Sequence, residues 1–299
     1  MLAKAPYVGY NVHMERTIIL YHANCPDGFG GAYAAWKKFG DTAEYRPLSY
    51  GNPAPDDLEG AHVYFIDFCY DQERMDAVKA VAKTLTVLDH HEGVEEVSTS
   101  MPEFVYDANR SGATIAWTFF HPEQPVPYLL TIIEDDDLFR FANPDTRPLM
   151  AYISVKPFSF DFWDELANTL DDSQHSETLL TKVRAYREYF DLLVEQSVDR
   201  AKLVLFEGYE VYAGTTHPVK PMVSAFGNAL AKKQGPMGLV LQLRQEGVAV
   251  SLRGDGTLDL TPIAQKYGGN GHPSSCAFMI PWGTPFPWTP VPKHEDSSN

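Results

Sequence analysis

The stretch Leu85-Thr86-Val87-Leu88-Asp89-His90-His91-Glu92 decides the fold. Its first four residues suit a buried strand, whereas the acid and the two imidazoles after them do not. In an open parallel sheet, ligands bind beyond the carboxyl ends of the strands. Carboxylate oxygens and imidazole nitrogens also bind divalent metals. The stretch therefore predicts a strand that carries Asp89, His90 and His91 to a site. For the tripeptide alone, a polar strand end with one histidine paired to a neighbouring acid is the more common explanation, because short motifs have many false positives.

Two earlier strands are predicted to end in the same kind of residue. Residues 17–21 suit a buried strand that leads into a polar turn from His22 to Asp27, and residues 62–66 suit a second strand that runs into Asp67. The carboxyl ends of neighbouring parallel strands meet at one edge of a sheet. Chance seldom places metal-capable groups after three successive strands, so this repetition is the strongest indication of a metal site.

Glycines follow the first of these turns and precede a predicted helix over residues 32–39. A strand, a polar turn and a helix begin a βαβ unit. The spacing of Gly28, Gly30 and Gly31 is not a dinucleotide-binding fingerprint, and no Lys-Ser/Thr follows to make a phosphate-binding loop. These glycines are expected either to admit a ligand or to let the helix pack closely on the sheet.

Two further stretches of the first half carry polar groups. Ser111 can cap a helix that runs to about residue 120, and Asn109 and Arg110 before it offer groups that suit phosphate, although Arg110 is equally well interpreted as a surface arginine. Residues 134–137 are four consecutive carboxylates, which repel one another unless a cation is near. A solvated acidic loop is the alternative.

The second half changes in character. Residues 158–170 and 176–202 are predicted to be helices, the second with one apolar face formed by Leu179, Val183, Tyr186, Phe190 and Leu193. Residues 239–243 and 248–252 predict a hairpin, residues 261–266 a helix, and residues 268–272 a glycine-rich turn that could contact phosphate. Residues 281–299 hold five prolines and predict a loosely ordered tail.

Composition limits the function. The chain has 299 residues, a formal net charge of −16 and no apolar run long enough to span a bilayer. This charge argues against binding of long duplex nucleic acid, which needs a basic face, and leaves small phosphorylated partners open. Three widely spaced cysteines suggest a reducing, cytoplasmic location, and no signal peptide is visible. Met14 is a candidate start, with residues 1–13 as an extension, and a homodimer is left open.

The order and spacing of these blocks over about residues 17–280 resemble the DHH phosphoesterase superfamily, which includes RecJ-type exonucleases, nanoRNase and pAp-phosphatase enzymes, exopolyphosphatase-related proteins and family II pyrophosphatases. The resemblance is carried by residues 22–28, Asp67, residues 89–91, residues 135–141, residues 224–230, residues 250–253 and residues 268–272. It implies an α/β fold: a doubly wound, mainly parallel sheet in residues 14–157, a helical connector in 158–202, a smaller α/β domain in 203–281 and a flexible tail in 282–299. The active-site cleft would lie between the two domains.

The resemblance also implies the site residues. The metal ligands carried over from the family would be Asp27, Asp67, His90 and one aspartate of the acidic run, Asp135. His22, which is one residue out of step with the family pattern, is added as a further candidate ligand. The catalytic residues would be Asp67, Asp89, His90 and His91. In this scheme Asp89 orients its neighbours and His91 faces the scissile phosphate. Arg253, Asn270 and His272 would bind the substrate from the second domain. The chemistry of the residues adds Asn109, Arg110, Ser111 and Gly269 as further candidates for substrate binding. Two divalent metals are implied, commonly Mn²⁺, with other divalent ions left open.

The first block departs from the family pattern. Many relatives carry two aspartates there, whereas this chain keeps only Asp27 and has Cys25 in the place of the first. One metal position is therefore weak, empty or rebuilt from His22 and Cys25. Among the acidic residues, the position of Phe139 favours Asp135 as the fourth ligand, with Asp137 as the alternative.

The function that the resemblance implies is a metal-dependent phosphohydrolase, a phosphodiesterase or phosphatase that uses a metal-activated water. It would cleave a P–O bond in a short oligonucleotide, phosphoadenosine phosphate or a cyclic dinucleotide. Hydrolysis of polyphosphate anhydride bonds, as in exopolyphosphatases, is one alternative. A degenerate relative that binds nucleotides without cleaving them is the other, motivated by the altered first block.

Overall fold

The computed structural model describes residues 16–49, 51–217 and 220–292. The candidate start at Met14, the extension before it and the end of the predicted tail, residues 293–299, lie outside these ranges. The chain divides into two compact units, with the division between Val183 and Arg184 inside a long helix, and each unit is considered by itself. No helix in the described residues is both long enough and apolar enough to cross a membrane.

Unit 1 is built on a parallel sheet of five strands. They are β1 (Thr17–His22), β2 (Ala43–Leu48), β3 (His62–Ile66), β4 (Thr84–Asp89) and β5 (Glu103–Tyr106), in the order β2-β1-β3-β4-β5. All four pairings are parallel. The three strands predicted from the sequence are thus β1, β3 and β4, which are direct neighbours, so their carboxyl ends meet at one edge. Ile18, Ile19 and Leu20 are fully buried, as expected of a strand covered on both faces.

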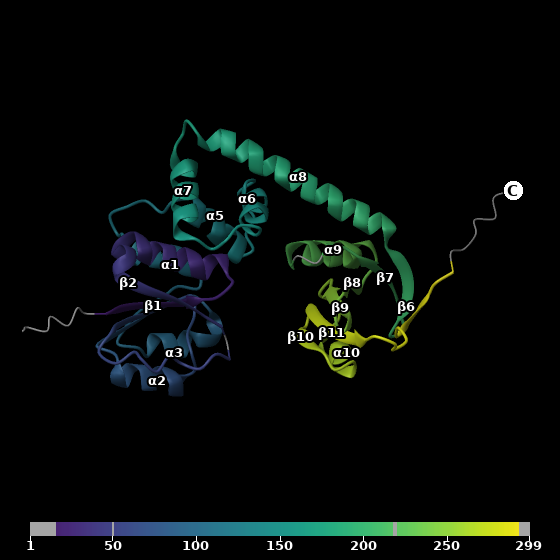
Figure 1. The fold of residues 1–299 in the computed structure, drawn as a ribbon, viewed down its shortest axis with the longest axis horizontal. Helices are drawn as coiled ribbons and strands as arrows, with labels where there is room; N and C mark the ends of the chain where they lie inside the picture. Colours follow the sequence, from purple (N-terminus) through teal and green to yellow (C-terminus); the bar gives the residue numbers. More distant parts are fainter. Residues whose placement is uncertain (1–15, 50, 218–219, 293–299) are drawn as a thin grey trace, which may run out of the picture. The chain divides into compact units, whose positions relative to one another are not determined.

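Helices cover both faces of this sheet, which confirms the predicted α/β, doubly wound class (Figure 1). One face carries α1 (Pro26–Phe39), α4 (Gly112–Phe120), α5 (Tyr128–Asp137), α6 (Thr146–Ile153) and α7 (Phe160–Asp171). The other carries α2 (Gln72–Val81) and α3 (Glu95–Thr99), and two short 3₁₀ turns are η1 (Gly40–Thr42) and η2 (Glu92–Val94). The predicted cap is present at α4, where Ser111 Oγ accepts a hydrogen bond from Thr114 N.

The glycines at the start of α1 allow this helix to pack closely against the sheet. A Cβ atom at Gly28 would lie 2.3 Å from the carbonyl oxygen of His22, and one at Gly31 would lie 2.2 Å from Cγ2 of Ile66. Both distances are far below a normal van der Waals contact, so the first turns of α1 can approach β1 and β3 this closely only without side chains. This close packing brings the start of α1 to the edge where the three strands end.

Unit 2 contains a mixed sheet of seven strands, which confirms a second α/β body. The strands are β6 (Lys202–Phe206), β7 (Tyr209–Thr215), β8 (Met237–Leu243), β9 (Gly247–Gly254), β10 (Asn270–His272), β11 (Ser275–Pro281) and β12 (Trp288–Pro290). Their order is β10-β11-β9-β8-β7-β6-β12, and only the β7–β8 pairing is parallel. Strands β8 and β9 form the predicted hairpin. Helix α9 (Lys220–Lys233) packs Phe226 and Leu230 on one face, and α10 (Thr261–Lys266) packs Ala264 on the other.

Three details of this half differ from the sequence analysis. The long helix α8 (Ser176–Arg200) leaves Tyr186 48% exposed, although the apolar periodicity placed it on a packed face. The predicted glycine-rich turn contains the short strand β10, and the predicted tail contains β12, which pairs with β6. Backbone pairing at the sheet edges accounts for both strands, and such pairing leaves little trace in hydrophobic patterns.

Candidate metal centre

Side chains from three adjacent strand ends and two helices meet at one edge of the unit 1 sheet. His22 ends β1, Asp67 follows β3, and His90 and His91 follow β4. Three groups of these side chains have donor atoms within 4.8 Å of one another: His22–Cys25–Asp67, Asp67–His90–His91 and Asp27–His90–Asp137. We call these seven residues the donor cluster. Each group has the kind of donors that bind divalent metals.

Asp67 lies at the centre of the donor cluster. Its Oδ1 is 3.2 Å from Nε2 of His90 and 3.7 Å from Nδ1 of His91, whereas its Oδ2 is 3.3 Å from Nδ1 of His22. Its backbone has a φ of 56°, a left-handed conformation that is uncommon for a non-glycine residue and clusters at functional sites. The two oxygens of this buried carboxylate thus face different groups of the donor cluster, so Asp67 would be able to contribute a ligand atom to each of two ions.

Asp27 is held by the first turn of α4. Its Oδ2 accepts a 2.7 Å hydrogen bond from the backbone N–H of Gly112, and its Oδ1 accepts one of 2.9 Å from Ala113. Nε2 of His90 lies 3.6 Å from Oδ2. Each carboxylate oxygen has two lone pairs, so both remain able to bind a metal. The helix therefore orients the Asp27 carboxylate and leaves lone pairs on both oxygens available.

Asp137, rather than Asp135, lies among the donors. The acidic run is the last turn of α5 instead of a loop, and Oδ2 of Asp137 is 3.5 Å from Nε2 of His90. Asp135 instead accepts hydrogen bonds from the backbone N–H groups of Ala142 and Asn143, at 2.9 and 3.2 Å, and from the Thr146 hydroxyl. The geometry thus reverses the order in which the sequence ranked these two aspartates.

Asp89 makes three contacts that fix its neighbours. Its Oδ1 accepts hydrogen bonds from the backbone N–H groups of His90 (2.7 Å) and His91 (3.0 Å) and from Nδ1 of His91 (2.8 Å). An ionised carboxylate can only accept, so Nδ1 of His91 carries a proton and Nε2 is left for another partner. The His91 side chain is 37% exposed and can therefore meet a ligand from solution.

Charge in the donor cluster suits a cation. Burial, together with the charges of Asp67 and Asp137, raises the pKa of Asp27 well above its usual value. Burial alone would also raise the pKa of Asp67, but the neighbouring imidazoles of His22 and His90 lower it to about 2. Buried carboxylates repel one another, and a divalent ion among them would remove that cost. The residues present therefore fit a metal.

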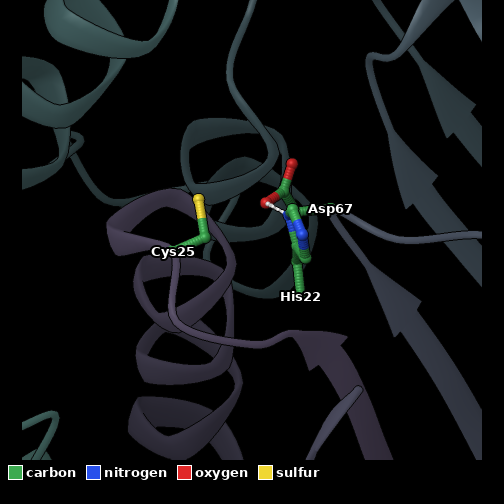
Figure 2. A group of neighbouring side chains, drawn as sticks. All are labelled: His22, Cys25 and Asp67. Carbon is green, nitrogen blue, oxygen red and sulfur yellow. Dashed lines mark ion pairs between the residues drawn. The ribbon is translucent and has the colours of Figure 1, made fainter. Parts of the chain in front are cut away.

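Cys25 adds a sulfur donor beside His22 and Asp67 (Figure 2). It occupies the position before α1, where a side chain often caps the helix, but it makes no capping hydrogen bond. Burial, with the Asp67 charge adding to it, raises the pKa of the Cys25 thiol. Cys25 is partly exposed, whereas Cys69 and Cys276 are buried.

The residues proposed for phosphate contact near α4 have structural partners. The Arg110 guanidinium donates to Thr114 O (2.6 Å) and Thr118 Oγ1 (2.9 Å), and the backbone N–H of Ser111 donates to Glu134 Oε2 (3.1 Å). The carbonyl oxygen of Asn109 accepts from Arg140. None of the three belongs to the donor cluster.

Sequence reasoning missed Gly112. A Cβ atom there would lie 2.6 Å from Cβ of Asp67 and 3.1 Å from Oδ2 of Asp27. No local sequence signal separates this glycine from others, because its role depends on contacts with Asp67 and Asp27, which are distant in the sequence.

In unit 2 the predicted substrate residues lie in one row. His272 pairs with Ser275 of β11, and Ser275 pairs with Arg253 of β9. The side chains of directly paired residues point to the same face of the sheet, so Arg253 and His272 share a face. Asn270 lies two residues before His272 on β10, and its side chain points to that face as well. Arg253 donates to Ser224 Oγ at 3.2 Å. Gly269 instead serves close packing, because a Cβ atom there would lie 2.1 Å from the Ala277 carbonyl oxygen.

Sequence comparison relates this chain to a viral protein. No protein-family model matches the sequence. An uncharacterized protein of Acanthamoeba polyphaga mimivirus is 25% identical over 278 residues, which cover 85% of this chain and 65% of the viral protein. The chain thus matches slightly less than two thirds of that relative.

Two solved structures superpose over most of the chain. The DHH domain of a protein described as a member of a ribosomal protein family has a TM-score of 0.58 and 13% identity, over 89% of this chain and 82% of the other. A pGpG-specific phosphodiesterase from Vibrio cholerae has a TM-score of 0.51 and 16% identity, over 90% and 94%. At such identities the likeness concerns the fold. Together with the strand order and the three strand ends, it shows that the chain has the fold of the DHH superfamily.

Proposed function

We propose that this protein is a metal-dependent phosphohydrolase whose active site is the donor cluster. The observation that carries the proposal is the position of Asp67, whose two carboxylate oxygens face separate donor groups. Such a carboxylate suits two ions held close together, an arrangement that stabilises both the attacking and the leaving oxygen in phosphoryl chemistry. The pGpG-specific phosphodiesterase with this fold supports the reaction class.

The protein groups divide into ligands and orienting residues. Asp27, Asp137 and His90 would hold one ion, and Asp67 would share it with a second position near His22. The bound ions supply Lewis acidity, which lowers the pKa of a water and neutralises charge on phosphate oxygens. Carboxylates and one imidazole suit Mn²⁺ at the first position.

In this proposal His91 acts on the substrate. Asp89 holds its Nδ1 proton, so Nε2 can face a phosphate oxygen. The hydrogen bond to Asp89 also raises the pKa of His91, although burial opposes this, and so favours the charged form that donates to phosphate. We expect His91 to bind or protonate a phosphate oxygen while Asp89 fixes its orientation.

The proposed substrate is small. A net charge of −16 disfavours long duplex nucleic acid. Short oligonucleotides, phosphoadenosine phosphate, cyclic dinucleotides and short polyphosphates fit a local metal-held phosphate. Arg253, Asn270 and His272 would add contacts from unit 2.

The test is a screen of these four substrate classes with Mn²⁺ and Mg²⁺, read out as released phosphate or mononucleotide. We expect turnover that a chelator abolishes and that Asp67→Asn loses, with the variant still folded by circular dichroism. An Asp67→Asn protein whose activity stays within about tenfold of the parent would contradict the assignment. Tight binding of a nucleotide without turnover would instead identify a binding protein.

A further inference from the structure

We infer that His22, Cys25 and Asp67 form a second metal position that prefers a softer ion, Zn²⁺ or Fe²⁺, over Mn²⁺. The inference concerns the metal centre of the proposed function and deepens it, but it does not require that the protein hydrolyse phosphate. The three residues come from the end of β1, the start of α1 and the end of β3, so the fold itself brings them together (Figure 2).

The geometry is close to that of a bound site. The imidazole nitrogen, the sulfur and the carboxylate oxygen lie within 4.8 Å of one another, and Nδ1 of His22 is 3.3 Å from Oδ2 of Asp67. Zinc binds such atoms at about 2.0–2.3 Å in a tetrahedron, which places the donors roughly 3.3–3.8 Å apart. Movements of about 1 Å would therefore close the three donors around an ion and leave a fourth position for water or substrate.

The donor types set the preference. A thiolate is a soft ligand that selects zinc and similar ions, whereas carboxylates and water suit Mg²⁺ and Mn²⁺. The other position, Asp27, Asp137 and His90, has two carboxylates and no sulfur. Because Asp67 would contribute a ligand atom to both metal positions, the centre would hold two different ions on either side of one carboxylate. On binding, the Cys25 thiol proton passes to solvent and a thiolate–metal bond forms.

Cys25 is well placed to report on this site. Its side chain is partly exposed and makes no helix-capping hydrogen bond, while the only other cysteines of the chain, Cys69 and Cys276, are buried. A thiolate–metal signal or a loss of thiol reactivity in the folded protein therefore identifies Cys25. The Cys276→Ala variant, altered in unit 2, is the matched control.

The first experiment adds Co²⁺ to the chelator-treated full chain and records the absorption spectrum. We expect a thiolate-to-cobalt charge-transfer band in the near ultraviolet, which Zn²⁺ displaces and Mn²⁺ does not. The band should be absent in Cys25→Ser and retained in Cys276→Ala. In parallel, Zn²⁺ should protect Cys25 from alkylation at concentrations where Mn²⁺ does not.

A second variant distinguishes a change in metal preference from a general loss of metal binding. Cys25→Asp supplies a hard donor, so Mn²⁺ should bind more tightly and Zn²⁺ at least about tenfold more weakly, with the fold unchanged. Absence of the cobalt band in the parent protein, or equal zinc affinity in the parent and Cys25→Ser, would overturn the inference. A clear band without any hydrolysis would refute the proposed function alone, and Mn²⁺-dependent hydrolysis without a band would refute this inference alone.

Discussion

The backbone N–H of Gly112 donates a 2.7 Å hydrogen bond to Oδ2 of Asp27, so the first turn of α4 forms one wall of the donor cluster. The same glycine leaves room for Asp67, since a Cβ atom would come within 2.6 Å of that residue. The ligand positions thus depend on a residue that offers no ligand atom of its own.

We predict that Gly112→Ala weakens metal binding. The added methyl group must displace Asp67 or α4, which should lower the stability by about 1–3 kcal/mol and reduce metal affinity. Metal titration and thermal unfolding measure the two effects. Gly93→Ala is the matched control, because a Cβ atom there meets nothing within 4 Å. Equal metal affinity in the two variants would show that Gly112 does not shape the site.

Asp137→Asn and Asp135→Asn should have opposite effects. Asp137 lies among the donors, and burial raises its pKa. A neutral asparagine should therefore leave the stability of the metal-free protein unchanged, but it should abolish metal binding. Asp135→Asn should keep the metal and lose about 1–3 kcal/mol of stability, because its hydrogen-bond donors lose their partners. Metal content and melting temperature separate the two, and the reverse pattern would restore Asp135 as the ligand.

Metal binding should strengthen as the pH rises. Burial alone would lower the pKa of His90, but the hydrogen bond to Asp67 and the nearby carboxylates raise it to about 9. A folded-state pKa above the unfolded value of about 6.5 means that protonated His90 stabilises the metal-free protein fully below pH 6.5. That stabilisation is lost as the pH rises towards 9.

A metal must displace this proton, so saturating Mg²⁺ should raise the melting temperature more at about pH 8.5 than at about pH 6.5. Thermal melts of chelator-treated protein with and without Mg²⁺ provide the comparison. His175→Gln should keep the difference, because that side chain is 69% exposed and lies outside the donor cluster. A metal-induced shift that is the same at both pH values would argue against His90 as a ligand.

Arg253→Ala should act on substrate binding. Its guanidinium could hold a phosphate with two hydrogen bonds, which positions a substrate without activating water. We expect KM to rise much more than kcat falls, with metal content unchanged. Arg244→Ala removes an exposed arginine from the β8–β9 turn and should leave both constants unchanged. An unchanged KM for Arg253→Ala, or a loss of metal, would rule out this role.

Much of the unit 1 sheet could be predicted from the sequence because its central strands are continuous apolar runs. Residues 17–21, 62–66 and 85–88 have that pattern, and they are β1, β3 and β4. Strand β2 was missed because Ala43–Leu48 contains a glutamate, an arginine and a proline, and β5 because it has only four residues. Both are edge strands, where partial exposure removes the apolar signal.

The site was predictable where strand ends supply the ligands and ambiguous where a helix does. His22, Asp67 and His90 follow from strand positions alone. The choice between Asp135 and Asp137 depends on helical phase, since two residues turn roughly 200° around a helix. The sequence suggested a solvated loop there, whereas α5 continues to Asp137 and directs it towards His90. The contact between the end of α5 and His90, which follows β4, depends on the tertiary structure, and no local sequence pattern predicts it.

The glycines at the start of α1 affect how variation in this protein should be interpreted. In a saturation mutagenesis survey, Gly28 and Gly31 should tolerate as little change as Asp27, because their neighbours His22 and Ile66 leave no space for a side chain. Intolerance in this segment would thus report on packing as often as on chemistry. A map of the active site drawn from tolerance alone would extend along α1, well past the residues that can touch a ligand.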